Sequence, residues 1–173
     1  MTRWARAALL AASAIATLVA WPATAEEERA PAPALSLRDL DGKQVNLADL
    51  RGKVVVISLW ASWCAPCKQE LKHLDAMYRR LKGQGLVVLA VSTDGPETQA
   101  DVRGTVRQAR WQVPVLVDRE GAAMARLNPR GTVPFTLFID RRGRQAQRHE
   151  GYTAGDERAY GTLIDKLLAE PAP

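Results

Sequence analysis

Cysteine and histidine are scarce in this chain, which has two of each among 173 residues. Two cysteines are too few to scaffold a disulfide-rich mini-protein. They do not supply the four ligands of a structural zinc site either, and only the two histidines could add to them. These counts exclude cysteine-rich scaffolds and leave a single cysteine pair to consider.

The chain also lacks a strong charge imbalance and, after residue 25, a long apolar run. The formal net charge is +5, and 47% hydrophobic with 25% charged residues is the composition of a soluble globular protein. The mild basic excess gives no reason to expect a nucleic-acid partner. No later segment has the roughly 20 apolar residues that a membrane span needs.

The N-terminal residues Met1 to Ala25 have the pattern of a secretory signal peptide. Arg3 and Arg6 precede an uncharged stretch, and Ala23-Thr24-Ala25 matches the small-residue cleavage site. Cleavage would place the mature protein where disulfides persist, and an uncleaved N-terminal anchor is the alternative. We expect residues 26–34 to form an extended Pro/Ala-rich linker without a packed role, followed by one domain over residues 35–173.

Hydrophobic patterning predicts an α/β fold. Val54 to Trp60 and Leu86 to Ser92 are continuous apolar runs, typical of strands buried on both faces of a sheet. The remaining expected elements are hairpins over 35–46 and 135–150, a strand over 115–117, and helices over 65–82, 96–110, 121–127 and 156–169. Strands that alternate with helices and end in a hairpin predict a mixed sheet with helices on both faces.

Both cysteines lie in one segment, Trp60 to Lys68, between the first apolar strand and the following helix. Cys64 and Cys67 are three residues apart, so both sulfurs lie on one side of a helix start and can bond to each other. A helix N-terminus stabilises a thiolate, and Pro66 fits the first turn. We therefore expect Cys64 to be the exposed nucleophile and Cys67 the less accessible resolving thiol.

The cysteine pair has two other interpretations. A purely structural disulfide is disfavoured, because a loop this small restrains the unfolded chain very little. A cuprous-ion site is chemically feasible, because two thiolates hold that soft metal. His73 and Met77 share a helix face and could suggest copper, but their spacing fits packing equally well, and we expect no metal or cofactor beyond the cysteine pair itself.

The segment Trp63-Cys64-Ala65-Pro66-Cys67-Lys68 resembles the W-C-x-P-C-K motif of the thioredoxin superfamily, in its exported TlpA/ResA/CcmG-like branch. Thr132-Val133-Pro134 and the following strand are similar to the family's proline loop. The resemblance implies a thioredoxin fold with an N-terminal hairpin and a central βα insertion between Leu86 and Arg130. It covers residues 35–169.

The resemblance also implies how a substrate binds. Val133-Pro134 would be a cis bond, and Val133 would pair with an extended substrate segment beside Cys64. Trp63, Ala65 and Pro66 would contact the same segment. The alternative for Pro134 is an ordinary strand-edge proline. We expect Trp60 to be a core residue and Trp63 a partly exposed lip of the site.

Glu70 is the third catalytic candidate. Cytosolic thioredoxin has a buried aspartate where this chain has Ser58, whereas ResA-like proteins have a glutamate three residues after the second cysteine, here Glu70. A carboxylate one turn beyond Cys67 would raise nearby thiol pKa values and could exchange a proton with Cys67. The alternative is a solvated helix carboxylate.

These features predict a periplasmic thiol–disulfide oxidoreductase that reduces disulfides of exported proteins. The resemblance suggests a DsbD/CcdA-type membrane electron donor, and substrates from cytochrome c maturation or from oxidase and copper-site assembly. A disulfide-introducing oxidase and a thioredoxin-fold copper-binding assembly factor are the alternatives. A peroxidase is disfavoured, because Ala61 stands where the T-x-x-C signature has threonine. We expect His149 and a basic turn at Arg141, Arg142, Arg144 and Arg148 to be structural or solvated.

Overall fold

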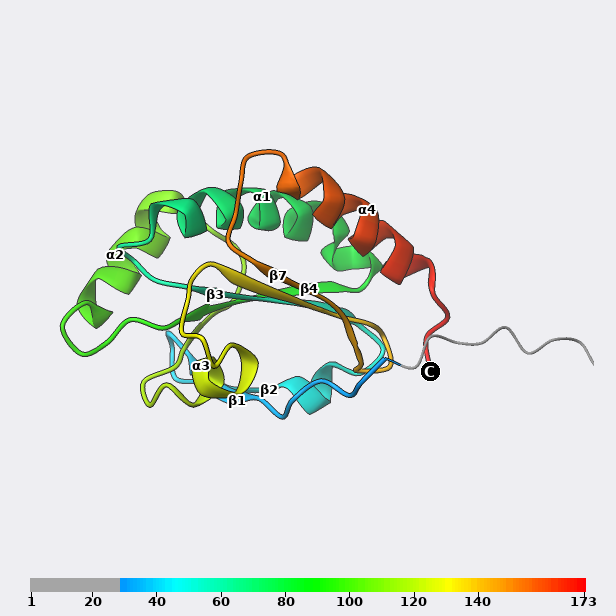
Figure 1. The fold of residues 1–173 in the computed structure, drawn as a ribbon, viewed down its shortest axis with the longest axis horizontal. Helices are drawn as coiled ribbons and strands as arrows, with labels where there is room; N and C mark the ends of the chain where they lie inside the picture. The colour runs from blue at the N-terminus through cyan, green and yellow to red at the C-terminus, as the bar shows by residue number, and fades with distance from the viewer. Residues whose placement is uncertain (1–28) are drawn as a thin grey trace, which may run out of the picture.

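The computed structural model describes residues 29–173, arranged around one seven-stranded mixed sheet (Figure 1). The expected signal peptide therefore lies outside the described residues. The strands are β1 (Ser36–Asp39), β2 (Gln44–Asn46), β3 (Val54–Trp60), β4 (Leu86–Ser92), β5 (Val115–Val117), β6 (Phe135–Ile139) and β7 (Gln145–Glu150). Their order across the sheet is β2-β1-β5-β4-β3-β6-β7. The pairs β3–β4 and β4–β5 are parallel, and every other neighbouring pair is antiparallel.

Helices cover both faces of this sheet. The α-helices are α1 (Ala65–Leu81), α2 (Gln99–Ala109), α3 (Ala122–Leu127) and α4 (Asp156–Ala169), with short 3₁₀ turns at Leu47–Leu50 and Lys82–Gln84. Figure 1 shows α1, α2 and α4 on one side of the sheet and α3 on the other. This arrangement is the predicted thioredoxin fold, with the N-terminal β1–β2 hairpin and the inserted elements between β4 and β6. No helix among residues 29–173 is long and apolar enough to cross a membrane.

Strand β3 is the centre of the fold, and all seven of its residues are buried. Its alternate side chains divide between two cores. Val54, Val56 and Trp60 pack with α1 and α4, whereas Val55, Ile57 and Leu59 pack with α3. This two-sided burial explains the continuous apolar run in the sequence. The one polar residue in the strand, Ser58, is also fully buried, on the side that faces α1.

Two sequence predictions need correction. Helix α2 begins at Gln99 instead of residue 96, because the carbonyl of Gly95 accepts the N–H groups of both Thr98 and Gln99 in a turn. The basic turn is also less solvated than expected. Arg141 donates to the carbonyls of Gly52 and Leu168, so it joins the turn to two distant segments.

The described part of the predicted linker is packed, which the sequence did not indicate. Pro31 forms a β-bridge with Arg144, and the Ala32 N–H donates to the Gly143 carbonyl. The Arg29 guanidinium lies 2.8 Å from a Glu170 carboxylate oxygen and 3.0 Å from Asp140. The segment that precedes β1 is therefore held against the sheet edge and the end of α4. The prediction of a linker without a packed role is wrong from Arg29 onward.

This anchoring predicts that Arg29→Ala lowers the free energy of unfolding by about 1–3 kcal/mol, because hydrogen bonds to charged partners are lost. The Arg29 side chain is only 14% exposed, so solvent screens its ion pairs weakly. Urea unfolding of purified protein measures the loss.

Arg130→Ala is the matched control, because Arg130 pairs with Glu150 while its side chain is 76% exposed. Its loss should stay within about 1 kcal/mol. Equal losses in the two variants would contradict the packed role of residue 29.

Candidate active site

Cys64 and Cys67 are joined as a disulfide at the N-terminus of α1, with their Cα atoms 5.3 Å apart. Cys64 is the N-cap residue, and its sulfur accepts the backbone N–H of Cys67 at 3.3 Å. The Cys64 N–H in turn donates to the Ala61 carbonyl at 3.0 Å, which closes the turn between β3 and the helix. A sulfur placed at a helix start and contacted by a backbone N–H is favoured as a thiolate.

The two sulfurs differ in accessibility in the predicted direction. Cys64 is 5% exposed and Cys67 is fully buried, so Cys64 is the more accessible sulfur, but the expectation that it is exposed is wrong. Trp63, immediately before Cys64, is 65% exposed, and it is the one exposed large hydrophobic side chain among residues 29–173. Ala65 and Pro66 are exposed as well. A macromolecular partner would therefore contact this rim and reach Cys64 first.

The proline loop reaches the same edge of the sheet as the disulfide. The Val133–Pro134 peptide bond is cis, and β6 begins with the next residue. Phe135 pairs with Leu59, one residue before the end of β3, so the loop and the strand that leads to Cys64 meet at that edge. Val133 is half-buried and packs against the core cluster that contains both cysteines. The predicted substrate-binding residues thus come together at one end of the sheet.

Glu70 is fully buried, so the alternative of a solvated helix carboxylate is wrong. Its carboxylate accepts three hydroxyl groups: Ser58 at 2.9 Å, Thr136 at 2.7 Å and Tyr160 at 2.9 Å. Burial raises the pKa of Glu70, and the hydroxyl donors partly oppose that shift. Burial and the Glu70 charge raise the pKa of Tyr160 in turn, so this phenol remains a donor.

Sequence reasoning did not predict Thr136 and Tyr160 as partners of Glu70. Thr136 lies in the strand after the proline loop, and Tyr160 lies one turn before Ile164 on the buried side of α4. A fully buried threonine in an apolar strand and a tyrosine in an apolar helix stripe both need a hydrogen-bond partner. This need for a partner is the sequence signal that could have pointed to Thr136 and Tyr160. The sequence drew attention to Ser58 by its position, but not to its role as a donor to Glu70.

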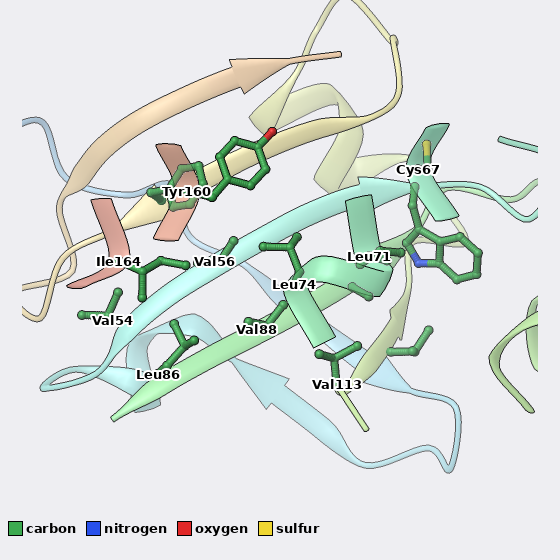
Figure 2. Packing of buried hydrophobic residues seen from close by; sticks show 14 of the residues in the cluster. Val54, Val56, Cys67, Leu71, Leu74, Leu86, Val88, Val113, Tyr160 and Ile164 are labelled. Carbon is green, nitrogen blue, oxygen red and sulfur yellow. The ribbon is translucent and has the colours of Figure 1, made fainter. Parts of the chain in front are cut away.

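An apolar core continues inward from the disulfide. Figure 2 shows Cys67 at one end of a row along α1 that continues with Leu71 and Leu74. Trp60 is fully buried, as predicted, and its ring meets Trp111 edge-on at 5.1 Å. The inner sulfur therefore lies in a dry environment, which disfavours a free charge on it.

The two histidines make their contacts away from the sulfurs. His149 contacts Asp156 at 3.1 Å and packs edge-on against Tyr160, whereas the His73 ring lies 6.3 Å from that of Tyr152. Within residues 29–173 no group of three or more His, Cys, Asp or Glu side chains is arranged to hold a metal ion.

The raised pKa of Glu70 makes a prediction about stability. Between the unfolded pKa, about 4.3 for glutamate, and the higher folded value, the folded state binds a proton that the unfolded state has lost. The contribution of Glu70 to the free energy of unfolding should therefore fall through this interval as the pH rises, and Glu70→Gln should remove that contribution. Urea unfolding of both oxidised proteins from pH 4 upward measures the difference.

As the pH rises, the free energy of unfolding of Glu70→Gln should increase relative to that of wild type. A gap that does not vary with pH would show that burial leaves the Glu70 carboxyl unperturbed.

Comparison with known proteins agrees with this geometry. The AhpC/TSA family model matches residues 29–147. A thiol-disulfide oxidoreductase ResA of Bacillus cereus is 32% identical over 117 residues, which cover 68% of this chain and 66% of ResA. ResA of Bacillus subtilis (strain 168) is 30% identical over 117 residues, covering 68% of this chain and 64% of that protein. The matched segments thus span about two thirds of the length of these relatives.

Solved structures give the same result. A Chlorobium tepidum protein described as the thiol:disulfide interchange protein DsbE superposes with a TM-score of 0.74 at 30% identity, covering 82% of this chain and 97% of that one. The exposed lipoprotein thioredoxin Etrx1 of Streptococcus pneumoniae superposes with a TM-score of 0.66 at 29% identity, covering 78% and 100%. Fold, cysteine pair and family match together show that the chain belongs to the AhpC/TSA family of the thioredoxin superfamily, among the thiol-disulfide oxidoreductases similar to ResA and DsbE.

Proposed function

We propose that this thiol-disulfide oxidoreductase acts outside the cytoplasm and reduces disulfides in other exported proteins. The observation that carries the proposal is the Cys64–Cys67 pair at a helix N-terminus, with Cys64 next to the exposed Trp63, Cys67 fully buried, and the buried Glu70 carboxylate one turn further along the helix. The signal-peptide pattern of residues 1–25 supports the compartment. Ala65-Pro66 between the cysteines resembles the dipeptides of reductants and differs from the Pro-His pair of DsbA.

The cycle begins with the reduced protein. The Cys64 thiolate attacks one sulfur of a substrate disulfide, forms a mixed disulfide and releases the first substrate thiolate. The Cys67 thiolate then attacks the Cys64 sulfur, which releases the second substrate thiolate and leaves the Cys64–Cys67 disulfide. Two electrons pass to the substrate, and each released thiolate takes up a proton.

Glu70 has a defined part in this proposal. Cys67 must lose its proton before it attacks, and it is fully buried, so water cannot readily accept that proton. Glu70 lies one helical turn further along α1 and is equally buried. Because burial raises the pKa of Glu70 toward that of a thiol, transfer of the proton to Glu70 costs less free energy.

The substrate segment would bind at the rim already described. Val133 precedes the cis bond at the edge where β3 ends, and an extended segment could pair with its backbone beside Cys64. Trp63, Ala65 and Pro66 supply the opposite, exposed side of this contact. We further propose that a membrane electron donor of the DsbD/CcdA type restores the dithiol. Apocytochrome c or oxidase and copper-site assembly proteins are the proposed substrates.

Trapping tests the assigned roles. A Cys67→Ala protein, expressed where the native protein acts, should accumulate mixed disulfides through Cys64, because no second thiol resolves them. Non-reducing gels with and without a reductant measure this accumulation.

Cys64→Ala is the control and should trap nothing, because the remaining sulfur is buried. Trapping by Cys64→Ala in the absence of trapping by Cys67→Ala would reverse the assignment of nucleophile and resolving thiol.

A further inference from the structure

Ser62, two residues before Cys64, forms hydrogen bonds through its backbone N–H, its hydroxyl group and its carbonyl. Its backbone N–H donates to the Asp94 carboxylate at 2.9 Å, and its hydroxyl donates to the same carboxylate at 2.5 Å. Its carbonyl accepts the Lys68 ammonium at 3.0 Å, from the first turns of α1. Every polar group of Ser62 is therefore engaged by residues on either side of the redox loop.

Asp94 is built into the edge of the sheet beside this loop. It follows β4 and is 2% exposed. The Ser92 hydroxyl donates to it at 2.9 Å, and the N–H of Thr93 donates to the carbonyl of Trp60, the last residue of β3, at 2.8 Å. The hydrogen bonds to its carboxylate come from the N–H and hydroxyl of Ser62 and from the hydroxyl of Ser92. Burying a carboxylate in this way has a free-energy cost, which favours a specific role.

We propose that Asp94 is a positioning residue for the redox loop, acting through Ser62 and assisted by Lys68. Three sets of contacts hold Cys64: the bond to Cys67 in the oxidised protein, the N–H groups of Cys67 and Lys68 at the helix start, and the turn that Ala61 and Ser62 form before it. Reduction removes the covalent tie. The dithiol form then depends on the Asp94–Ser62–Lys68 contacts to keep Cys64 at the helix start.

Because the contacts matter more in the dithiol form, the sign of the redox shift can be predicted. Weakening the contacts destabilises the reduced form more than the oxidised form, so the disulfide becomes harder to reduce. The proposal rests on thiol–disulfide exchange at Cys64, but not on which way electrons flow in the cell.

The test is the redox equilibrium of purified Asp94→Asn with glutathione, compared with wild type. The amide places an NH₂ group where a carboxylate oxygen accepted donors, so at least one contact to Ser62 is lost. A lost hydrogen bond to a charged group corresponds to a roughly tenfold lower equilibrium constant for reduction. A tenfold change equals a shift of about 30 mV to more negative potential for this two-electron couple.

Asp75→Asn is the matched control. Asp75 is also a buried carboxylate: it accepts the backbone N–H groups of Gln112 and Val113, and it pairs with Arg79 on its own helix. It lies near the middle of α1, about 12 Å along the helix from Cys67. The Asp75→Asn substitution should lower the free energy of unfolding and change the equilibrium constant for reduction by less than about twofold.

Ser62→Ala and Lys68→Met make the test independent of whether Asp94→Asn folds. Each removes one contact of the same set, and each should shift the equilibrium toward the disulfide by a smaller factor. Unchanged equilibria in both variants, a shift toward the dithiol, or an equal shift in Asp75→Asn would overturn the proposal. An oxidising potential in the wild-type protein would overturn the proposed reductase function alone, because the inference depends only on differences between variants and wild type.

Discussion

The buried carboxylate of Glu70 is the constraint on which the rest of the site depends. Its three hydroxyl donors come from β3, β6 and α4, while Glu70 itself belongs to α1. Leaving a carboxylate buried without such donors would cost several kcal/mol. The helix that carries both cysteines is therefore fixed to β3, to β6 and to the last helix by a polar contact inside an apolar core. The same contact keeps the Glu70 carboxyl group one turn from the inner sulfur, as the proposed proton transfer requires.

The outer part of the site depends on the edge where the parallel strands end. β3 leads into the Ala61–Cys64 turn, β4 leads into Asp94, and the cis bond precedes β6 at that edge. Hydrogen bonds between the loops that follow β3 and β4 hold the segment before Cys64, while Glu70 holds the helix from the core side. Both sulfurs thus lie in a hydrogen-bonded frame, with Trp63 exposed beside the more accessible Cys64.

The sequence was informative where the signal was local. The apolar runs of β3 and β4 and the cysteine motif each lie in a short continuous segment, and the structure places them as predicted. The partners of Glu70 lie 12, 66 and 90 positions away, and those of Arg29 lie 111 and 141 positions away. Helical periodicity places Glu70 beside Leu71 and Leu74, but it cannot show which hydroxyls meet it. The packed residues before β1 were missed for the same reason, because a Pro/Ala-rich composition reveals nothing about a distant carboxylate.

The reduction potential of the Cys64–Cys67 pair tests the central claim most directly. Purified wild-type protein is equilibrated in graded glutathione buffers, and the fluorescence of the nearby tryptophans, Trp60 and Trp63, reports the redox state. The account predicts a potential near that of thioredoxin, about −270 mV, as a reductant requires. A potential near that of DsbA, about −120 mV, would contradict it and would make the protein a donor of disulfides.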